Sequence, residues 1–237
     1  MWSGPRNIST AMMRAWESRG DTCVCDEPLY AHYLQQSGAA HPGAAEVITH
    51  HQTDWRKVVG WLTGPVPEGK AIFYQKHMAH HLLPSVGREW LDRVTHCFLI
   101  REPKAMLASL IQVTPEPGLA DTGLPQQLEL FRVVRERTGQ VPPVLDARDV
   151  LIDPRSSLSQ LCAALDVPFT ERMLAWEPGL RPTDGVWARY WYGAVEQSRG
   201  FRPYAPRPVT LPSRWNELLR ESDNLYEQLF EHRLTKC

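Results

Sequence analysis

Cysteine pairs of the Cys-x-x-Cys type are missing from this sequence, and their absence excludes two kinds of site. The 237 residues include five cysteines, an odd number, and no two of them form a Cys-x-x-Cys pair. The sequence therefore indicates neither a zinc ribbon nor a thioredoxin-type redox site. Cys23 and Cys25 alternate along an apolar run, so we interpret them as small core residues of a protein in a reducing compartment.

Strong charge and long apolar runs are also missing. The formal net charge is −1, so we expect no large basic surface for nucleic acid, while a local anion site is compatible with this balance. The apolar runs at 97–100 and 105–113 are far shorter than the roughly 18 residues of a membrane span. No charged N-terminal region precedes an apolar stretch, so no signal peptide is indicated. We therefore expect a cytoplasmic protein.

Short apolar runs alternate with segments of helical periodicity, which is typical of an α/β fold. We predict a three-layer, P-loop-like fold in one domain over residues 1–237, with a central parallel sheet flanked by helices. The expected strands lie at 2–4, 22–25, 71–75, 95–100 and 143–147. The expected helices lie at 9–18, 29–36, 54–62, 103–111, 126–137, 155–165 and 214–230.

Two features of this pattern are unusual. The first expected strand is very short, whereas strands commonly have about five or six residues, so we expect the natural product to begin upstream with a longer apolar strand. The segment at 178–212 is rich in Gly and Pro and also contains Trp, Tyr and Arg. Long loops in compact domains are usually functional or disordered, and this aromatic content favours a functional segment.

The most informative segment begins at Trp2 and reads Trp-Ser-Gly-Pro-Arg-Asn-Ile-Ser-Thr. A loop that opens a helix presents free backbone N–H groups at the positive end of the helix dipole. Arg6 adds a forked donor with a fixed charge, and Ser9 and Thr10 add hydroxyl groups. Together these groups favour a site for phosphate or sulfate. The alternative is an ordinary helix cap beside a solvated arginine.

The loop lacks the features of a Walker A motif. The GxxxxGK[ST] spacing and its lysine are missing, and no Walker B strand can be assigned. ATP with Mg²⁺ is therefore disfavoured, and a P-loop kinase acting on a small molecule is the weaker alternative.

A second anion-binding candidate follows the apolar run Cys-Phe-Leu-Ile. The run ends in Arg101, Pro103 opens an expected helix, and Ser109 lies on that helix. Strand ends at the carboxyl edge of a parallel sheet line the ligand crevice. The alternative is a salt-bridged arginine and a buried serine.

Both segments resemble motifs of the sulfotransferase family that uses 3′-phosphoadenosine 5′-phosphosulfate (PAPS). The first is similar to the family's 5′-phosphosulfate loop at four positions, namely Pro5, Arg6, Ser9 and Thr10. It departs from that loop at Asn7 and at Ile8, where the family has Gly; because a β-branched residue rarely adopts a positive φ, we expect a less close approach to the phosphate. The second resembles the family's 3′-phosphate motif, with matches at Arg101, Pro103 and Ser109.

The resemblance covers roughly residues 2–170, because the stretch 149–169 is similar to the segment after the family's last core strand. It implies a cofactor-binding core at about 1–170, followed by an acceptor or lid region and a C-terminal helix at about 171–237. Residues 198–201 are similar to the family's late Arg-x-Gly loop over the 3′-phosphate. The implied cofactor-binding residues are Pro5, Arg6, Asn7, Ile8, Ser9, Thr10, Arg101, Ser109, Arg199 and Gly200.

The resemblance implies an enzyme that moves a sulfuryl group from PAPS to a hydroxyl or amine of a small-molecule or carbohydrate acceptor, without a metal. Arg6 would then face the charge that develops on the leaving phosphate. An alternative of a different class is a sulfotransferase-like nucleotide-binding module without catalysis. Several aromatic residues favour a ring-bearing acceptor, namely Trp55, Trp61, Trp187, Tyr190 and Trp191.

Two residues are candidates for the base that takes the acceptor's proton. Glu27 follows the second expected strand and resembles the Glu of a Glu-Pro pair in carbohydrate-type sulfotransferases, although it could instead cap the next helix. His77 follows the third expected strand and resembles the catalytic His of cytosolic sulfotransferases; the family has Lys two residues before it, where this chain has Gln75 and then Lys76. The residues His77, His80 and His81 share one face at helical spacing, but no acidic or Cys ligand is spaced to complete a metal site.

Overall fold

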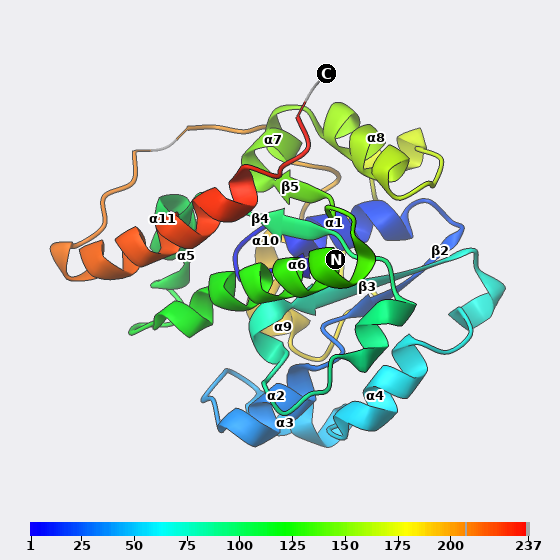
Figure 1. The fold of residues 1–237 in the computed structure, drawn as a ribbon, viewed down its shortest axis with the longest axis horizontal. Helices are drawn as coiled ribbons and strands as arrows, with labels where there is room; N and C mark the ends of the chain where they lie inside the picture. Colours follow the sequence, from blue (N-terminus) through cyan, green and yellow to red (C-terminus); the bar gives the residue numbers. More distant parts are fainter. Residues whose placement is uncertain (207, 236–237) are drawn as a thin grey trace. The chain divides into compact units, whose positions relative to one another are not determined.

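A computed structural model describes residues 1–206 and 208–235 of the chain. Its five strands form a parallel sheet in the order β2-β3-β1-β4-β5, accompanied by helices (Figure 1). The predicted α/β fold, with a central parallel sheet flanked by helices, is thus confirmed. The chain forms two compact units. The first comprises Met1–Ser9, Thr95–Phe169 and the chain from Arg202 onward, and the second comprises Thr10–Val94 and Thr170–Phe201.

The first unit is built on three short strands, β1 (Trp2–Ser3), β4 (Phe98–Ile100) and β5 (Val144–Asp146). Every residue of these strands is buried, which is typical of a parallel sheet covered on both faces. Although β1 has only two residues, its backbone finds partners: Trp2 N donates to the Cys97 carbonyl at 2.8 Å, and the Gln127 amide donates to the Trp2 carbonyl at 3.3 Å.

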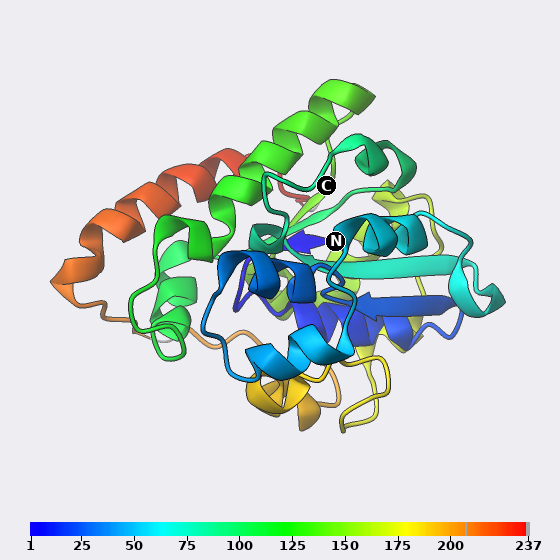
Figure 2. The ribbon, with the colours of Figure 1, turned by 90° about the horizontal axis from the view of Figure 1, so that it is seen from below.

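Helices follow each of the later strands in the first unit. They are α5 (Pro103–Leu110), η4 (Leu119–Thr122), α6 (Leu124–Thr138), α7 (Ala147–Ile152), α8 (Pro154–Ala164), η6 (Ser213–Trp215) and α11 (Asn216–Phe230). Helices α6 and α11 lie side by side in both ribbon views (Figures 1 and 2). Helix α7 was not expected. It begins because Asp146 Oδ1 accepts a hydrogen bond from the Arg148 N–H at 2.7 Å and caps the helix.

The second unit contains β2 (Thr22–Asp26) and β3 (Ile72–Met78), which pair in register from Thr22 with Ile72 to Asp26 with Lys76 and run side by side in Figure 2. Helix α1 begins at the last residue of the first unit and continues in the second. The helices that belong here are α1 (Ser9–Glu17), α2 (Tyr30–Ser37), α3 (Ala44–His50), α4 (Trp55–Leu62), η1 (Pro67–Gly69), η2 (Ala79–His81), η3 (Glu89–Arg93), η5 (Glu171–Leu174), α9 (Ala188–Trp191) and α10 (Gly193–Glu196).

Strand β3 is longer than expected, and this corrects one prediction. It continues past Gln75 to Met78 because β2 pairs with it as far as Lys76. His77 therefore lies inside a strand, whereas His80 and His81 lie in the 3-10 helix η2. The prediction that these three histidines share one helical face is wrong.

The other differences concern segments that were expected to be loops. Helix α3, which begins at Ala44, lies between the expected helices 29–36 and 54–62, where no element was expected, and the long segment 178–212 contains the short helices α9 and α10. Strand β4 begins only at Phe98, three residues later than expected. Within the described residues, no helix combines the length and the apolar character that crossing a membrane requires.

Candidate active site

The loop between β1 and α1 has an unusual backbone. Arg6 and Ile8 both adopt positive φ values, 61° and 57°. The expectation that Ile8 avoids this region is wrong, and the surrounding contacts hold the strained backbone, which costs about 1–3 kcal/mol per residue. The Asn7 side chain, between the two, donates to the Leu99 carbonyl at 3.2 Å. A Cβ at Gly4 would lie 2.4 Å from the Thr122 carbonyl oxygen, so the loop needs glycine there.

The structure brings the two predicted anion-binding segments into contact within the first unit. Arg6 Nε donates to Ser109 Oγ at 2.9 Å, and Arg101 Nη1 donates to the Arg6 carbonyl at 2.5 Å. In the described part of the chain, neither guanidinium forms an ion pair with a carboxylate. Arg101 is thus hydrogen-bonded to backbone, and the alternative of a salt-bridged arginine does not apply.

These two guanidinium groups are electrostatically unfavourable neighbours. Burial lowers the pKa of Arg6, and burial together with the charge of Arg6 lowers the pKa of Arg101. The negative charges of Glu102 and Asp146 act on the pKa of Arg101 in the opposite direction. An anion placed between the guanidinium groups and the loop would relieve this repulsion, and the N-terminus of α1 at Ser9 adds free N–H groups.

A second polar group lies in the second unit, where β2 ends. The ammonium group of Lys76 donates to Asp26 Oδ1 at 2.7 Å, to Glu27 Oε1 at 2.6 Å and to Tyr192 Oη at 2.7 Å. The Tyr192 hydroxyl donates in turn to Asp26 Oδ2 at 2.6 Å. We call these four residues the carboxylate group. Lys76, Asp26 and Tyr192 are buried, and 12% of the Glu27 side chain is exposed.

The environment of Glu27 changes its chemistry. Burial and the neighbouring charge of Asp26 raise the pKa of Glu27, while Lys76 opposes this rise. Burial disfavours the charged form of Lys76, but the two carboxylates outweigh it and hold the pKa of Lys76 well above its usual value. Glu27 has a positive φ of 42°, and its N–H donates to the Lys76 carbonyl at 2.9 Å. The side chain is thus a carboxylate held in a fixed position with an increased affinity for protons.

The competing base candidate, His77, lies outside this group. Successive side chains of a strand point to opposite faces, so His77 points away from the face that carries Lys76. Its Nε2 lies 3.2 Å from Gln75 Oε1, and its ring centroid is 5.9 Å from that of Trp90. The histidine that approaches Glu27 is instead His81, whose Nδ1 is 3.9 Å from Glu27 Oε2. Burial lowers the pKa of His81 well below its usual value, so it is neutral.

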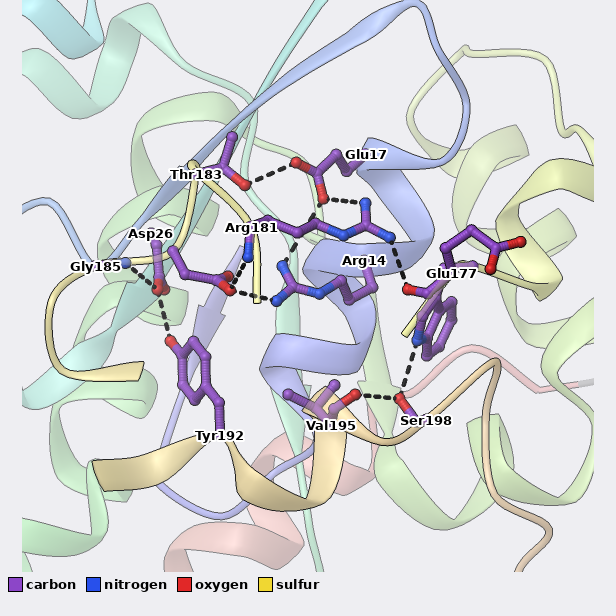
Figure 3. Close-up of polar contacts among 12 residues, drawn as sticks. Arg14, Glu17, Asp26, Glu177, Arg181, Thr183, Gly185, Tyr192, Val195 and Ser198 are labelled. Carbon is purple, nitrogen blue, oxygen red and sulfur yellow. Dashed lines mark hydrogen bonds and ion pairs between the residues drawn. The ribbon is translucent and has the colours of Figure 1, made fainter. Parts of the chain in front are cut away.

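The segment 177–198 is connected to α1 and to the carboxylate group by hydrogen bonds and ion pairs (Figure 3). The buried Arg14 donates to Asp184 Oδ2 at 2.5 Å, and Thr183 donates to Glu17 Oε1 at 2.7 Å. Arg181 also pairs with Glu17. The Gly185 N–H lies 3.3 Å from Asp26 Oδ2. These contacts fix the backbone on the N-terminal side of Tyr192.

Two further predicted residues, Arg199 and Gly200, lie in the second unit. Gly200 forms an antiparallel bridge with Ala175, and a Cβ at Gly200 would lie 2.8 Å from the Leu174 carbonyl oxygen. Arg199 is exposed and lies 3.4 Å from Glu177. Arg199 is thus an exposed residue next to a short β-bridge, and the role of these two residues at the 3′-phosphate stays a prediction.

Sequence reasoning identified Glu27 but missed the other members of its group as functional residues. The pair Asp26-Glu27 directly after an apolar strand was an available signal, and Lys76 was noted only as a departure from the family pattern. Tyr192 had no local signal, because it is separated from Asp26 by 166 positions. In the residues that the structure describes, no three His, Cys, Asp or Glu side chains are placed to hold a metal ion.

Comparison with known proteins agrees with the resemblance noted in the sequence. A family model described as "Sulfotransferase domain" matches residues 1–230. The chain is 36% identical over 234 residues to "Branched-chain-amino-acid aminotransferase-like protein 1" and 34% identical over 233 residues to "Branched-chain-amino-acid aminotransferase-like protein 2", both from Arabidopsis thaliana. Each alignment covers 98% of this chain but only 41% of the relative, so the chain spans about two fifths of their length.

A solved structure has the same fold. The sulfotransferase domain from the Synechococcus PCC 7002 olefin synthase superposes with a TM-score of 0.56 at 20% sequence identity, and the alignment covers 99% of this chain and 94% of that domain. At this identity the similarity establishes the fold and not the substrate.

Proposed function

Because the chain belongs to the sulfotransferase domain family, we propose that it transfers a sulfuryl group from PAPS to a hydroxyl or amine of a small-molecule or carbohydrate acceptor. One observation supports PAPS as the donor. Arg6 and Ser109, from the two segments that resemble the phosphosulfate and 3′-phosphate motifs, are in contact at 2.9 Å. A nucleotide with phosphate groups at both ends requires these segments to lie close together.

The residues of the first unit fit such a donor. Arg6 and Arg101 are two neighbouring cations that, among the described residues, have no carboxylate partner, and the loop leads into the N-terminus of α1. When bound, PAPS supplies a sulfuryl group that is already activated by its bond to phosphate. We assign the 5′ end to Arg6 and the loop, and the 3′-phosphate to Arg101 and Ser109. Donors fixed in advance at these positions stabilise charge on the leaving phosphate.

We assign to Glu27 the role of the base that takes the acceptor's proton. As the acceptor's oxygen or nitrogen bonds to sulfur and the bond from sulfur to phosphate oxygen breaks, the acceptor loses a proton that a base must take. Glu27 Oε1 is held by Lys76 at 2.6 Å, which leaves Oε2 to receive this proton. The raised pKa of Glu27 brings its proton affinity closer to neutral pH, which favours general base catalysis. His77, bonded to Gln75, is the alternative base.

The positions of the aromatic residues support a ring-bearing acceptor less strongly than the sequence suggested. Trp187 is almost completely buried and belongs to the core around Tyr30 and Leu34, so its ring is not available to an acceptor. Trp61 and Tyr190 are exposed by 48% and 44%. A ring-bearing acceptor therefore remains one class within the proposed range, and the described free cysteines, all buried, are compatible with the proposed cytoplasmic location.

Two measurements test the proposal. Isothermal titration should show binding of 3′-phosphoadenosine 5′-phosphate (PAP) and no comparable binding of ATP with Mg²⁺; the reverse preference would refute the donor assignment and indicate a kinase. Transfer of labelled sulfate from PAPS should then be measured over a panel of phenols, aliphatic alcohols, sugars and amines. Binding of PAP without transfer to any member of the panel would instead indicate a nucleotide-binding module.

A further inference from the structure

Two adjacent carboxylates share a single cation in the carboxylate group. All three N–H groups of the Lys76 ammonium have an acceptor, which are Asp26 Oδ1, Glu27 Oε1 and Tyr192 Oη at 2.6–2.7 Å. With both carboxylates ionised, the buried group carries one net negative charge. Burial of an unbalanced charge is costly unless hydrogen bonds stabilise it, so the donors around the two carboxylates decide whether the group keeps this charge.

The donors are distributed unequally between the two carboxylates. Asp26 accepts from Lys76 at 2.7 Å, from the Tyr192 hydroxyl at 2.6 Å and from the Gly185 N–H at 3.3 Å (Figure 3). The Glu27 carboxylate accepts a hydrogen bond from Lys76 at 2.6 Å, and the Tyr192 hydroxyl makes a smaller contribution that lowers the pKa of Glu27. The Tyr192 hydroxyl itself accepts from Lys76 and, at 3.2 Å, from Trp187 Nε1, so its own proton is directed to Asp26.

We propose that Tyr192 is a positioning residue that stabilises the negative charge shared by Asp26 and Glu27, and thereby keeps Glu27 Oε2 free to take a proton. That this proton comes from the acceptor rests on the proposed function. Tyr192 forms direct hydrogen bonds with Asp26 and Lys76, and its hydroxyl also lowers the pKa of Glu27. Its backbone position is secured by the contacts of Arg14 with Asp184.

Other titratable groups interact with Glu27 or Asp26 without supplying positive charge. From η2, His81 approaches Oε2 to 3.9 Å but is neutral, because burial lowers its pKa well below the usual value. From α2, Tyr30 stays protonated, because burial and the charge of Glu27 raise its pKa. After α3, burial also lowers the pKa of His51, against the opposing charge of Asp26. Lys76 and the Tyr192 hydroxyl therefore remain to stabilise the carboxylates.

The substitution Tyr192→Phe removes one donor from the anionic pair and leaves one N–H of Lys76 without its acceptor. The lost donor destabilises the ionised pair relative to its protonated form, whereas the lost acceptor of Lys76 is missing in both forms. Because the two carboxylates are coupled, the first proton belongs to the pair and not to either residue. The apparent pKa of the pair should therefore rise by about one unit, the effect expected from losing one hydrogen bond to a charged group.

The experiment is a pH titration of the free protein by ¹³C NMR, with glutamate carboxyl carbons labelled and the Glu27 signal assigned by its loss in Glu27→Gln. In Tyr192→Phe the titration midpoint of the Glu27 signal should move to higher pH by about one unit. Tyr190→Phe, two positions away with an exposed side chain, is the matched control and should keep the midpoint. An unchanged midpoint in folded Tyr192→Phe overturns the proposal.

A second variant covers the case in which Tyr192→Phe does not fold. Replacement of Tyr192 by 3-fluorotyrosine keeps the ring and hydroxyl and makes the hydroxyl a stronger donor, so the midpoint should move to lower pH. No change, or a move to higher pH, overturns the proposal. The titration uses neither donor nor acceptor, so its result is independent of the proposed function, whose failure appears separately as absence of PAP binding.

Discussion

The donor assignment makes a prediction that distinguishes two similar nucleotides. PAP carries a 3′-phosphate, whereas adenosine 5′-phosphosulfate does not. If Arg101 holds the 3′-phosphate, Arg101→Ala should weaken binding of PAP strongly and binding of adenosine 5′-phosphosulfate little. In the structure Arg101 uses Nη1 to donate to the Arg6 carbonyl, and a guanidinium has five N–H donors, so further donors remain for a ligand.

The size of the effect follows from the type of contact. A hydrogen bond to a charged group contributes about 1.5–3 kcal/mol, which corresponds to a loss of roughly 10- to 150-fold in affinity for PAP. Ser109→Ala should show a smaller difference between the two ligands, because Ser109 Oγ also accepts from Arg6 Nε at 2.9 Å. Losing that contact frees the side chain of Arg6, which is assigned to the 5′ end. Both PAP and adenosine 5′-phosphosulfate should then bind less tightly.

Isothermal titration of both ligands against wild type and the two variants measures these effects. Arg132→Ala is the matched control, because Arg132 is an exposed arginine of the first unit bonded to Gln228, and its loss changes the net charge equally. Equal losses for PAP and adenosine 5′-phosphosulfate in Arg101→Ala would show that Arg101 serves only to hold the loop through the Arg6 carbonyl.

Three further predictions concern Arg6, the base and the segment 177–198. Arg6→Ala should weaken PAPS binding by about 1.5–3 kcal/mol and also lower turnover; unchanged binding and turnover would refute the loop assignment. Glu27→Gln should keep PAP affinity and lower turnover by about 10²–10⁴-fold, with a milder effect of His77→Ala. A larger loss of turnover in His77→Ala than in Glu27→Gln would assign the role of base to His77. Wild-type activity should fall as pH decreases through the raised pKa of Glu27, because the base must be ionised. Asp184→Asn leaves the buried Arg14 without its close carboxylate and should lower the free energy of unfolding by about 3–5 kcal/mol, whereas Glu177→Gln, at an exposed pair, should change the melting temperature little.

The sequence predicted those parts of the site that depend on local patterns. The loop after Trp2 and the strand that ends at Arg101 each combine an apolar run, a basic residue and a helix start, so their place at strand ends could be read directly. Their convergence could not, because Arg6 and Ser109 are 103 positions apart. Only the parallel pairing of β1 with β4 brings the two segments together.

The second group was less accessible to sequence reasoning for a different reason. The role of Lys76 depends on strand length: β3 extends to Met78 because β2 pairs with it, and alternation along the strand then separates Lys76 from His77. An expected strand ending at Gln75 left both side chains in a loop, where their directions were undefined. Tyr192 comes from a segment that sequence reasoning read as a long loop, and its place depends on pairs such as Arg14 with Asp184.

Backbone strain occurs in both candidate groups, and it is independent of any resemblance. Among the described residues, five other than Gly have a positive φ, and three of them are Arg6, Ile8 and Glu27. Each such residue costs about 1–3 kcal/mol, and such conformations persist only where the surroundings over-determine them. Those surroundings are present here: Asn7 and Arg101 bond the loop, and the Lys76 carbonyl accepts from the Glu27 N–H. A chain selected for stability alone would place Gly at these positions, as the loop of the resembling family does at position 8. Retaining side chains there directs the Arg6 guanidinium toward Ser109 in the first unit and the Glu27 carboxylate toward Lys76 in the second.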